Sequence, residues 1–255
     1  MSTVKNETDL LERGISLFFP AYNEEANVGG TIDKCIEILE PFGCDYEIII
    51  VDDGSKDRTS EITKNYASNN PHVVLKRHEK NKGYGGALQT GFRSCRYGLL
   101  FFSDCDLQFD LSELTAFIER MKEDASIDVV IGYRIKRADP FIRKLNAFGW
   151  KIWARLLFGL NVRDIDCAFK LFKKEVMDNI VIESTGALSS VEFLTKIKNM
   201  GYKIIQMGVN HYPRKEGTQT GAKVSVIIRA FYESFKLYGK IRQFNREYAG
   251  TKKQD

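Results

Sequence analysis

The sequence lacks a long apolar segment and a framework of paired cysteines. No uninterrupted apolar run approaches the roughly 20 residues of a membrane-spanning helix, and the polar first twelve residues lack the apolar core of a signal peptide. The five cysteines are an odd number without zinc-binding spacing. We therefore expect reduced thiols and a cytoplasmic protein, either free or peripheral to a membrane.

Signals for several common architectures and chemistries are also missing. The chain has no internal repeat and no linker rich in proline, glycine or serine. It contains no P-loop, dinucleotide-binding glycine fingerprint, zinc-protease motif or nucleophile–base spacing. With 255 residues, 43% of them hydrophobic and 28% charged, it suits one large α/β domain with a sizeable core.

The net charge of +4 is small, but it is unevenly distributed. Residues 1–133 carry 14 Lys and Arg against 23 Asp and Glu, whereas residues 134–175 and 203–255 each carry 11 against 4. This asymmetry predicts an anionic partner for the later part of the chain. Nucleic acid is not expected, because no recognised nucleic-acid-binding motif accompanies the basic segments.

Apolar runs alternate with helical patterns along the first half of the chain. We expect strands over residues 15–20, 46–51, 73–75, 99–102 and 128–132, with helices between them. Such alternation is typical of a doubly wound, mostly parallel sheet. The fold class is therefore α/β, with ligands expected at the carboxyl ends of the strands.

The most informative strand, residues 99–102, runs directly into Asp104, Asp106 and Gln108. Alternate residues of an extended chain share a face, so these three oxygen-bearing side chains can point the same way. Carboxylate and amide oxygens suit a hard divalent cation, Mg²⁺ or Mn²⁺. The alternative is an Asx-rich turn in which aspartate caps the next helix.

Two segments of the later half, residues 141–158 and 224–244, combine apolar residues at helical spacing with lysines and arginines. Basic amphipathic helices that contain Trp and Phe can lie in a membrane interface. The alternative is that the apolar stripes pack on the sheet and the cations face water.

Four segments occur in order at predicted strand ends: residues 20–25, 51–57, 81–87 and 104–108. They read Pro-Ala-Tyr-Asn-Glu-Glu, Val-Asp-Asp-Gly-Ser-Lys-Asp, Asn-Lys-Gly-Tyr-Gly-Gly-Ala and Asp-Cys-Asp-Leu-Gln. This ordered set resembles the family 2 glycosyltransferases of GT-A fold, in particular their dolichol/polyprenyl-phosphate mannosyl- and glucosyltransferase branch. The resemblance extends from about Ile15 to about Phe244.

The resemblance implies roles for individual residues. The expected metal-binding residues are Asp104, Asp106 and Gln108. The expected donor-binding residues are Pro20, Tyr22, Glu24, Val51, Asp53, Lys82, Asp104, Cys105, Gln108 and Lys223. Cys105 stands where the family usually has a small residue. The expected catalytic residues are Asp106, Arg134, Arg214 and Glu192, and Arg143 matches a second arginine that approaches phosphate.

The residue types fit this chemistry, because negative charge grows on the departing nucleoside diphosphate and a divalent ion with Arg134 and Arg214 would stabilise it. A phosphate acceptor is already anionic, whereas a hydroxyl acceptor needs a carboxylate base, for which Glu192 is the candidate. The alternatives are thus a lipid-phosphate acceptor, a hydroxyl acceptor on a glycan, and a nucleotide-sugar binding protein without turnover.

The leading interpretation is an inverting, metal-dependent transfer of a hexose from a GDP- or UDP-sugar to a polyprenyl phosphate. The enzyme is expected to contact the cytosolic face of a membrane peripherally. We expect a polar tail over residues 1–13, a GT-A domain over residues 14–221, and an amphipathic helix and tail over residues 222–255.

Overall fold

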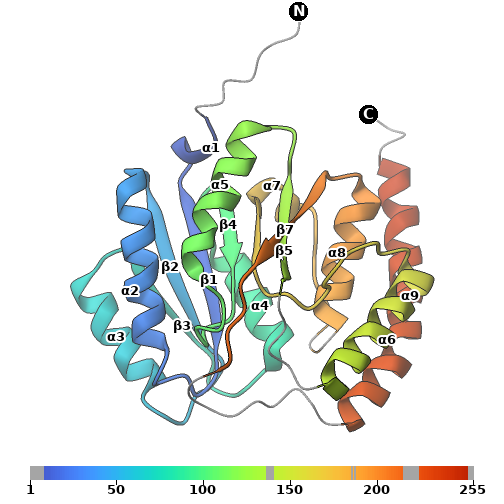
Figure 1. Ribbon diagram of the computed structural model, residues 1–255, viewed down its shortest axis with the longest axis horizontal. Helices are drawn as coiled ribbons and strands as arrows, with labels where there is room; N and C mark the ends of the chain where they lie inside the picture. Colours follow the sequence, from blue (N-terminus) through green and yellow to red (C-terminus); the bar gives the residue numbers. More distant parts are fainter. Residues whose placement is uncertain (1–8, 136–140, 185, 187, 215–223, 252–255) are drawn as a thin grey trace, which may run out of the picture.

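The computed structural model of the protein describes residues 9–135, 141–184, 186, 188–214 and 224–251. The side chains of residues 9, 141–148, 224–230 and 249–251 are not described. A seven-stranded sheet in the order β3-β2-β1-β4-β6-β5-β7 forms its centre (Figure 1). The strands are β1 (Ile15–Ala21), β2 (Tyr46–Asp52), β3 (Val73–Arg77), β4 (Leu99–Phe102), β5 (Val129–Arg134), β6 (Lys170–Lys173) and β7 (Ile204–Val209).

Most strand pairs are parallel, as the alternating sequence pattern predicts. Strand β1 pairs in parallel with β2 and β4, β2 with β3, and β5 with β7. Strand β6 runs antiparallel between β4 and β5. Strands β2 and β4 are buried along their whole length, which explains the continuous apolar runs over residues 48–51 and 99–102.

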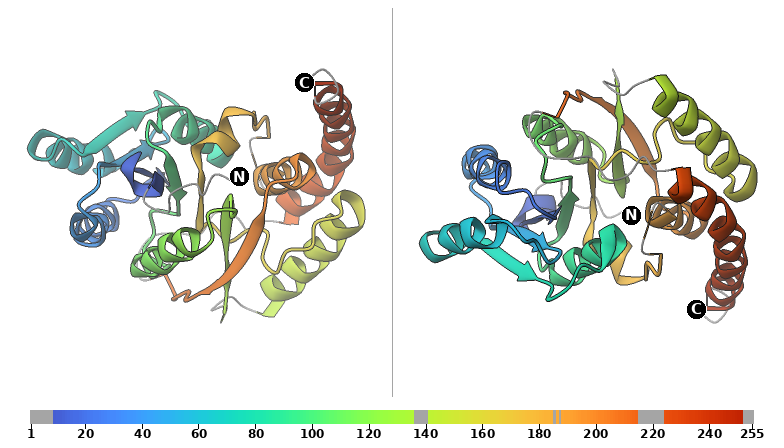
Figure 2. Two further views of the ribbon diagram at one scale, coloured as in Figure 1. Left: turned by 90° about the horizontal axis from the view of Figure 1, so that it is seen from above. Right: turned by 90° about the horizontal axis from the view of Figure 1, so that it is seen from below.

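Helices cover both faces of the sheet (Figure 2). They are α1 (Asp9–Glu12), α2 (Val28–Leu39), α3 (Thr59–Asn69), α4 (Gly83–Ser94), α5 (Leu114–Glu123), α6 (Phe141–Phe158), α7 (Lys174–Asp178), α8 (Leu188–Met200) and α9 (Val224–Thr251), with 3₁₀ turns at Glu40–Phe42 and Leu111–Glu113.

Successive aromatic residues of β4 pack against different layers, because successive side chains of a strand point to opposite faces. Phe102 packs edge-on against Phe92 of α4 and Phe193 of α8. Phe101 contacts Phe169, which in turn contacts Phe117 of α5. Strand β4 is therefore the centre of the core, and packing on both of its faces fixes the point at which the next loop begins.

The two basic amphipathic helices form as expected, and they lie together at one end of the sheet (Figure 1). Helix α6 has the predicted bounds, and α9 continues past the predicted end to Thr251. Within the described part of the chain, no helix has the length and apolar character needed to cross a membrane.

Candidate active site

The loops after β1, β2 and β4 meet at one edge of the sheet, because parallel strands end on the same side. Asp53, at the end of β2, accepts hydrogen bonds from the backbone N–H groups of Lys82 and Gly83, both at 2.8 Å. Its carboxylate also lies 2.6 Å from Nδ1 of His78. Asp53 thus fixes the glycine-rich turn that opens α4.

The loop after β1 is tied to the loop after β2. The N–H of Asn23 donates to Oγ of Ser55 at 2.9 Å, and Oδ1 of Asn23 accepts from the N–H of Lys56 at 2.8 Å. Asn23 has a φ of 57°, a left-handed conformation that asparagine tolerates better than most residues. These bonds hold the loop with Tyr22 exposed at the rim of the site.

The two aspartates that follow β4 lie at this edge. The hydroxyl of Tyr84, at the start of α4, interacts electrostatically with the Asp104 carboxylate. Burial and the neighbouring Asp106 carboxylate raise the pKa of Asp104 to about 7. Two carboxylates this close would gain from a shared cation.

Gln108 links this loop to a segment far along the chain. Its Nε2 donates to the carbonyl of Tyr212 at 2.9 Å, and the N–H of Tyr212 donates to the carbonyl of Gln108 at 2.7 Å. A β-bridge between Phe109 and His211 continues the contact. The amide of Gln108 therefore fixes the segment that leads to Arg214.

Arg214 contacts acidic side chains from two other loops of the site. Its Nη2 forms an ion pair with Glu24, and its Nη1 lies 3.8 Å from Oδ2 of Asp106. Burial raises the pKa of Glu24, although hydrogen bonds from Asn27 and Arg214 oppose that rise. Loops after β1, β4 and β7 thus converge on one guanidinium.

A second arginine lies nearby at the end of β5. Arg134 donates to Asp164 in a bidentate pair, with Nε–Oδ2 and Nη2–Oδ1 distances of 2.6 and 2.9 Å. The positive charge of Arg134 also acts on Asp104 and lowers its pKa, against the larger effect of burial. Arg134 therefore lies at the same edge as the two aspartates, already oriented by a planar carboxylate contact.

The charged side chains around Asp104 form what we call the acidic cluster. Among the residues that the structure describes, its members are Glu24, Asp104, Asp106, Asp164 and Asp166 on the acidic side and Arg134, Lys170 and Arg214 on the basic side. With every carboxylate ionised, the named members comprise five negative and three positive side chains, a balance that favours a bound cation.

The donor set also fits such an ion. The described residues contain no group of three or more His, Cys, Asp or Glu side chains that could hold a metal by themselves. Mg²⁺ is usually bound by one or two carboxylates, with water and substrate phosphate oxygens completing its shell. Asp104 and Asp106 match that smaller requirement.

The loop between these aspartates and Gln108 has an unusual backbone. Leu107 has a φ of 53°, a conformation that bulky side chains rarely adopt, and 40% of the residue is exposed. Its Cδ1 reaches α2, where a Cβ on Gly30 would lie only 3.2 Å away. The glycine therefore makes room for this turn.

Some residues with predicted roles face the core. Pro20 and Val51 pair with each other as the last but one residues of β1 and β2, where Pro20 is half-buried and the side chain of Val51 is fully buried. Cys105 is buried, and its Sγ faces Oγ1 of Thr31 at 3.8 Å. Val51 and Cys105 therefore have only backbone atoms to offer a donor in this arrangement. Lys223 and the side chain of Arg143 lie outside the described residues.

Glu192, the expected base for a hydroxyl acceptor, is buried on α8. Its carboxylate pairs with Nζ of Lys196 at 2.6 Å and accepts the N–H of Ser184 at 2.8 Å and of Glu183 at 3.2 Å. Burial opposes ionisation, but these contacts outweigh it and lower the pKa of Glu192. In this arrangement Glu192 stabilises the segment before α8.

The structure adds four residues to which our sequence reasoning assigned no role in the site: Tyr84, Asp164, Asp166 and Lys170. Tyr84 stands inside the glycine-rich turn, and its position directly after Gly83 was the available signal. Lys170 begins a short apolar strand, and a lysine there was the signal that a buried cation faces the site.

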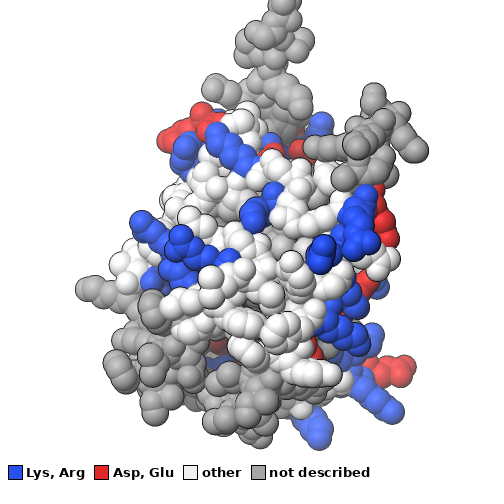
Figure 3. All heavy atoms as spheres, turned by 90° about the vertical axis from the view of Figure 1, so that its right-hand side faces the viewer, with Lys and Arg blue, Asp and Glu red and all other residues white. Residues whose placement is uncertain are grey.

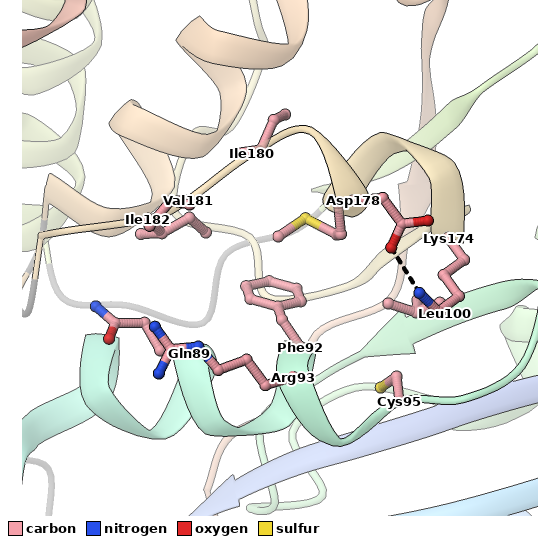
Figure 4. Close-up of a pocket in the computed structure, with 11 residues that line it drawn as sticks. Gln89, Phe92, Arg93, Cys95, Leu100, Lys174, Asp178, Ile180, Val181 and Ile182 are labelled. Atoms are coloured by element: carbon pink, nitrogen blue, oxygen red, sulfur yellow. Dashed lines mark hydrogen bonds and ion pairs between the residues drawn. The ribbon is translucent and has the colours of Figure 1, made fainter. Parts of the chain in front are cut away.

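A separate hollow lies between α4, α7 and the segment after α7 (Figure 4). Its volume is about 340 Å³. Phe92, Leu100 and Ile182 contribute apolar walls, and the ion pair between Lys174 and Asp178, at 2.6 Å, closes one side. None of the residues with predicted roles lines it.

Comparisons with known proteins agree with this geometry. The family model described as glycosyl transferase family 2 matches residues 16–181. Dolichyl-phosphate beta-glucosyltransferase of Dictyostelium discoideum is 27% identical over 228 residues, which is 82% of this chain and 69% of that protein. Dolichol-phosphate mannosyltransferase of Pyrococcus furiosus is 28% identical over 235 residues, 89% of this chain and 65% of that protein.

A third relative is undecaprenyl-phosphate 4-deoxy-4-formamido-L-arabinose transferase of Pectobacterium carotovorum, 26% identical over 81% of this chain and 62% of that protein. The chain thus spans about two thirds of the length of these relatives. Among solved structures, glucosyl-3-phosphoglycerate synthase of Mycobacterium tuberculosis with Mn²⁺, UDP and phosphoglyceric acid has a TM-score of 0.67 at 19% identity, covering 91% of this chain and 78% of that one. That likeness supports the GT-A fold.

Proposed function

The chain belongs to glycosyl transferase family 2, and from that membership we propose that it transfers a hexose from a UDP- or GDP-sugar to a polyprenyl phosphate. The observation that carries the proposal is the convergence of Asp104, Asp106 and Arg214 at the carboxyl ends of the strands. Relatives named for dolichyl- and undecaprenyl-phosphate acceptors support the choice of acceptor.

In this proposal Asp104 and Asp106 would hold Mg²⁺ or Mn²⁺, and the bound ion would supply positive charge beside the leaving nucleoside diphosphate. Arg214 exchanges its contacts with Glu24 and Asp106 for the donor phosphates, and Arg134 adds charge from the opposite side. These preorganised cations stabilise the negative charge that develops as the sugar–phosphate bond breaks.

The acceptor phosphate attacks the anomeric carbon from the side opposite the diphosphate, which inverts the configuration there. A phosphate oxygen is already anionic near neutral pH, so this reaction needs no protein base. The environment of Glu192 supports a phosphate acceptor, because its carboxylate is already bound to Lys196 and to backbone N–H groups.

We further propose that α6 and α9 present the protein to a membrane. The two helices pack through the ring of Trp153, which lies 4.1 Å from the ring of Phe231 and donates from Nε1 to Oγ of Ser234 at 3.0 Å. On the same two helices, Leu156 is 77% exposed and Tyr232 is 79% exposed. We call the exposed surface that these residues form with Trp153 and Phe231 the α6–α9 face.

The exposure pattern argues against burial of the apolar stripes on the sheet. Ile152 and Leu156 of α6 and Phe231 and Phe235 of α9 are exposed, whereas the positions that face inward are Ala154, Phe158, Leu237 and Ile241. Lys and Arg gather around an uncharged area on this side of the molecule (Figure 3). Exposed aromatic and aliphatic groups bordered by cations suit the interface of an anionic membrane, for which we propose the cytosolic face.

The test is a screen of radiolabelled UDP- and GDP-hexoses with Mn²⁺ and a short-chain polyprenyl phosphate. We expect label in a product that partitions into organic solvent, carries one phosphate and releases the sugar in mild acid. A reaction without acceptor measures hydrolysis of the donor by water. Label found only on a water-soluble hydroxyl acceptor, and lost in Glu192→Gln, would replace the lipid-phosphate acceptor. Donor binding without any transfer would favour a binding protein.

A further inference from the structure

Lys170 is a buried lysine in the middle of the sheet, on the strand between the two that lead to Asp104 and Arg134. It pairs with Phe102 of β4 on one side and with Ile131 of β5 on the other. Because paired residues of neighbouring strands share a face, Lys170 lies on the same face of the sheet as Phe102, which precedes Asp104 by two residues. Only 1% of the residue is exposed.

The ammonium group has few direct contacts for a buried charge. Its Nζ donates to the carbonyl of Cys167 and lies 5.2 Å from the ring centre of Phe102. Among the described residues, no carboxylate comes within ion-pair distance of it. A buried charge normally requires compensation by opposite charge, so the compensation for Lys170 must come from carboxylates at longer range.

Those carboxylates belong to the acidic cluster. Asp104, Asp164 and Asp166 all act on Lys170 and raise its pKa, although burial has the larger effect and lowers it overall. Lys170 in turn favours the ionised form of Asp104. The dependence is mutual, because the lysine needs the acids to remain charged and the acids need the lysine to remain together.

We propose that Lys170 is a resident counter-cation of the acidic cluster, holding its carboxylates together without a divalent ion and weakening the binding of that ion. The inference rests on the proposed function, which places Mg²⁺ or Mn²⁺ at Asp104 and Asp106. Lys170 neither binds the metal nor touches the substrate. Its effect arises from the repulsion between its charge and that of an incoming cation, which keeps metal binding reversible.

The experiment measures Mn²⁺ binding without nucleotide sugar, by the electron paramagnetic resonance signal of free Mn²⁺ at pH 7.0, where a lysine with a lowered pKa keeps more of its charge than at alkaline pH. Lys170→Met is expected to bind Mn²⁺ on the order of tenfold more tightly than the wild type, since the repulsion is removed. Lys170→Gln removes the charge but keeps an N–H donor for the Cys167 carbonyl. If the charge alone opposes the metal, this variant should also bind Mn²⁺ more tightly than the wild type. The matched control is Lys173→Met, at the far end of β6, where Lys173 pairs with Asp128 at 3.1 Å. That control should leave the affinity unchanged.

Thermal melting provides the second readout. Without metal, Lys170→Met should melt at a lower temperature than the wild type, and Mn²⁺ should raise its melting temperature by more than it raises that of the wild type. Wild-type or weaker Mn²⁺ affinity in both Lys170 variants would overturn the inference, as would a Lys170→Met protein that stays unfolded at saturating Mn²⁺. Failure of the wild type itself to bind Mn²⁺ would instead refute the metal role in the proposed function, and this inference with it.

Discussion

Substitution of Gln108 by glutamate distinguishes two roles that this residue could have. The sequence motif predicts that its side-chain oxygen contacts the metal, whereas the structure shows its Nε2 donating to the carbonyl of Tyr212. Gln108→Glu keeps an oxygen that can bind a cation and removes the N–H donor. A carboxylate would then face a carbonyl oxygen at a position that is only 9% exposed.

The expected cost derives from the loss of that buried hydrogen bond. Leaving a buried acceptor unsatisfied costs about 1–3 kcal/mol, and each 1.36 kcal/mol corresponds to about a tenfold change in rate. If this energy holds the segment that carries Arg214 in place, kcat/KM for sugar transfer should fall by about 10- to 100-fold. Mn²⁺ affinity should be retained or increased, because a carboxylate replaces an amide.

The assay pairs transfer kinetics with direct Mn²⁺ binding, and Gln206→Glu is the matched control. Gln206 accepts the N–H of Arg163 through its side-chain oxygen at 2.6 Å, a contact that glutamate preserves. The donor that glutamate removes makes only a long, exposed contact with the Asn161 carbonyl at 3.5 Å, so that variant should stay close to wild type. Wild-type transfer by Gln108→Glu would refute the positioning role. Lost transfer that excess Mn²⁺ restores would also refute it, since metal binding alone would then explain the defect.

Three further outcomes test other parts of the structure. Asp106→Asn should reduce turnover by at least about 100-fold, the scale of losing a main charge-stabilising group, and EDTA should abolish wild-type transfer; undiminished transfer by that variant in chelator would remove the metal role. The wild type should bind anionic vesicles at low salt and release them at high salt, and Leu156→Ser with Phe235→Ser should bind more weakly; indifference of the wild type to vesicles would reject the membrane role of the α6–α9 face. Glu192→Gln should lower the free energy of unfolding at neutral pH, because Lys196 loses its buried partner. A carboxyl group whose pKa is lowered on folding stabilises the fold above its ordinary pKa of 4.5, and this stabilisation is lost as pH falls through the folded-state value. The difference in free energy of unfolding between wild type and Glu192→Gln should therefore shrink below pH 4.5. A difference that persists in acid would contradict this role of Glu192.

The parts of the site that depend on local pattern could be predicted from the sequence. The fully apolar run of β4 identified a buried strand that leads into Asp104 and Asp106. The extended alternation expected beyond it was wrong, because the chain turns there: Leu107 has a φ of 53°, and Asp106 accepts the N–H of Gln108 at 3.1 Å. The helical spacing of residues 141–158 gave the bounds of α6. In each case the sequence pattern and the element that it predicts occupy the same short segment of the chain.

The parts that depend on long-range pairing could not be predicted. Strand β6 has four residues, and its antiparallel insertion between β4 and β5 is decided by partners about 40 and 70 residues away in sequence. The contact of Gln108 with Tyr212 likewise depends on the path of the chain after β7. The partner of Glu192 was accessible, because Lys196 stands four residues later on the same helix, a spacing that brings side chains together.

The close approach of Leu107 to Gly30 has a consequence for how this protein can vary. A methyl group on α2 would lie 3.2 Å from Cδ1 of Leu107, so the Leu107 side chain would have to turn while its backbone stays in the left-handed conformation. Gly30→Ala should therefore disturb the turn between Asp106 and Gln108, and Leu107→Gly should relieve both the steric pressure and the backbone conformation. The two positions form an epistatic pair: the effect of a substitution at one depends on the residue at the other, and a double-mutant cycle would measure the coupling. In homologous sequences we expect a larger residue at position 30 to accompany a smaller one at position 107, so that a helix position without chemistry of its own constrains the evolution of the loop that carries the aspartates.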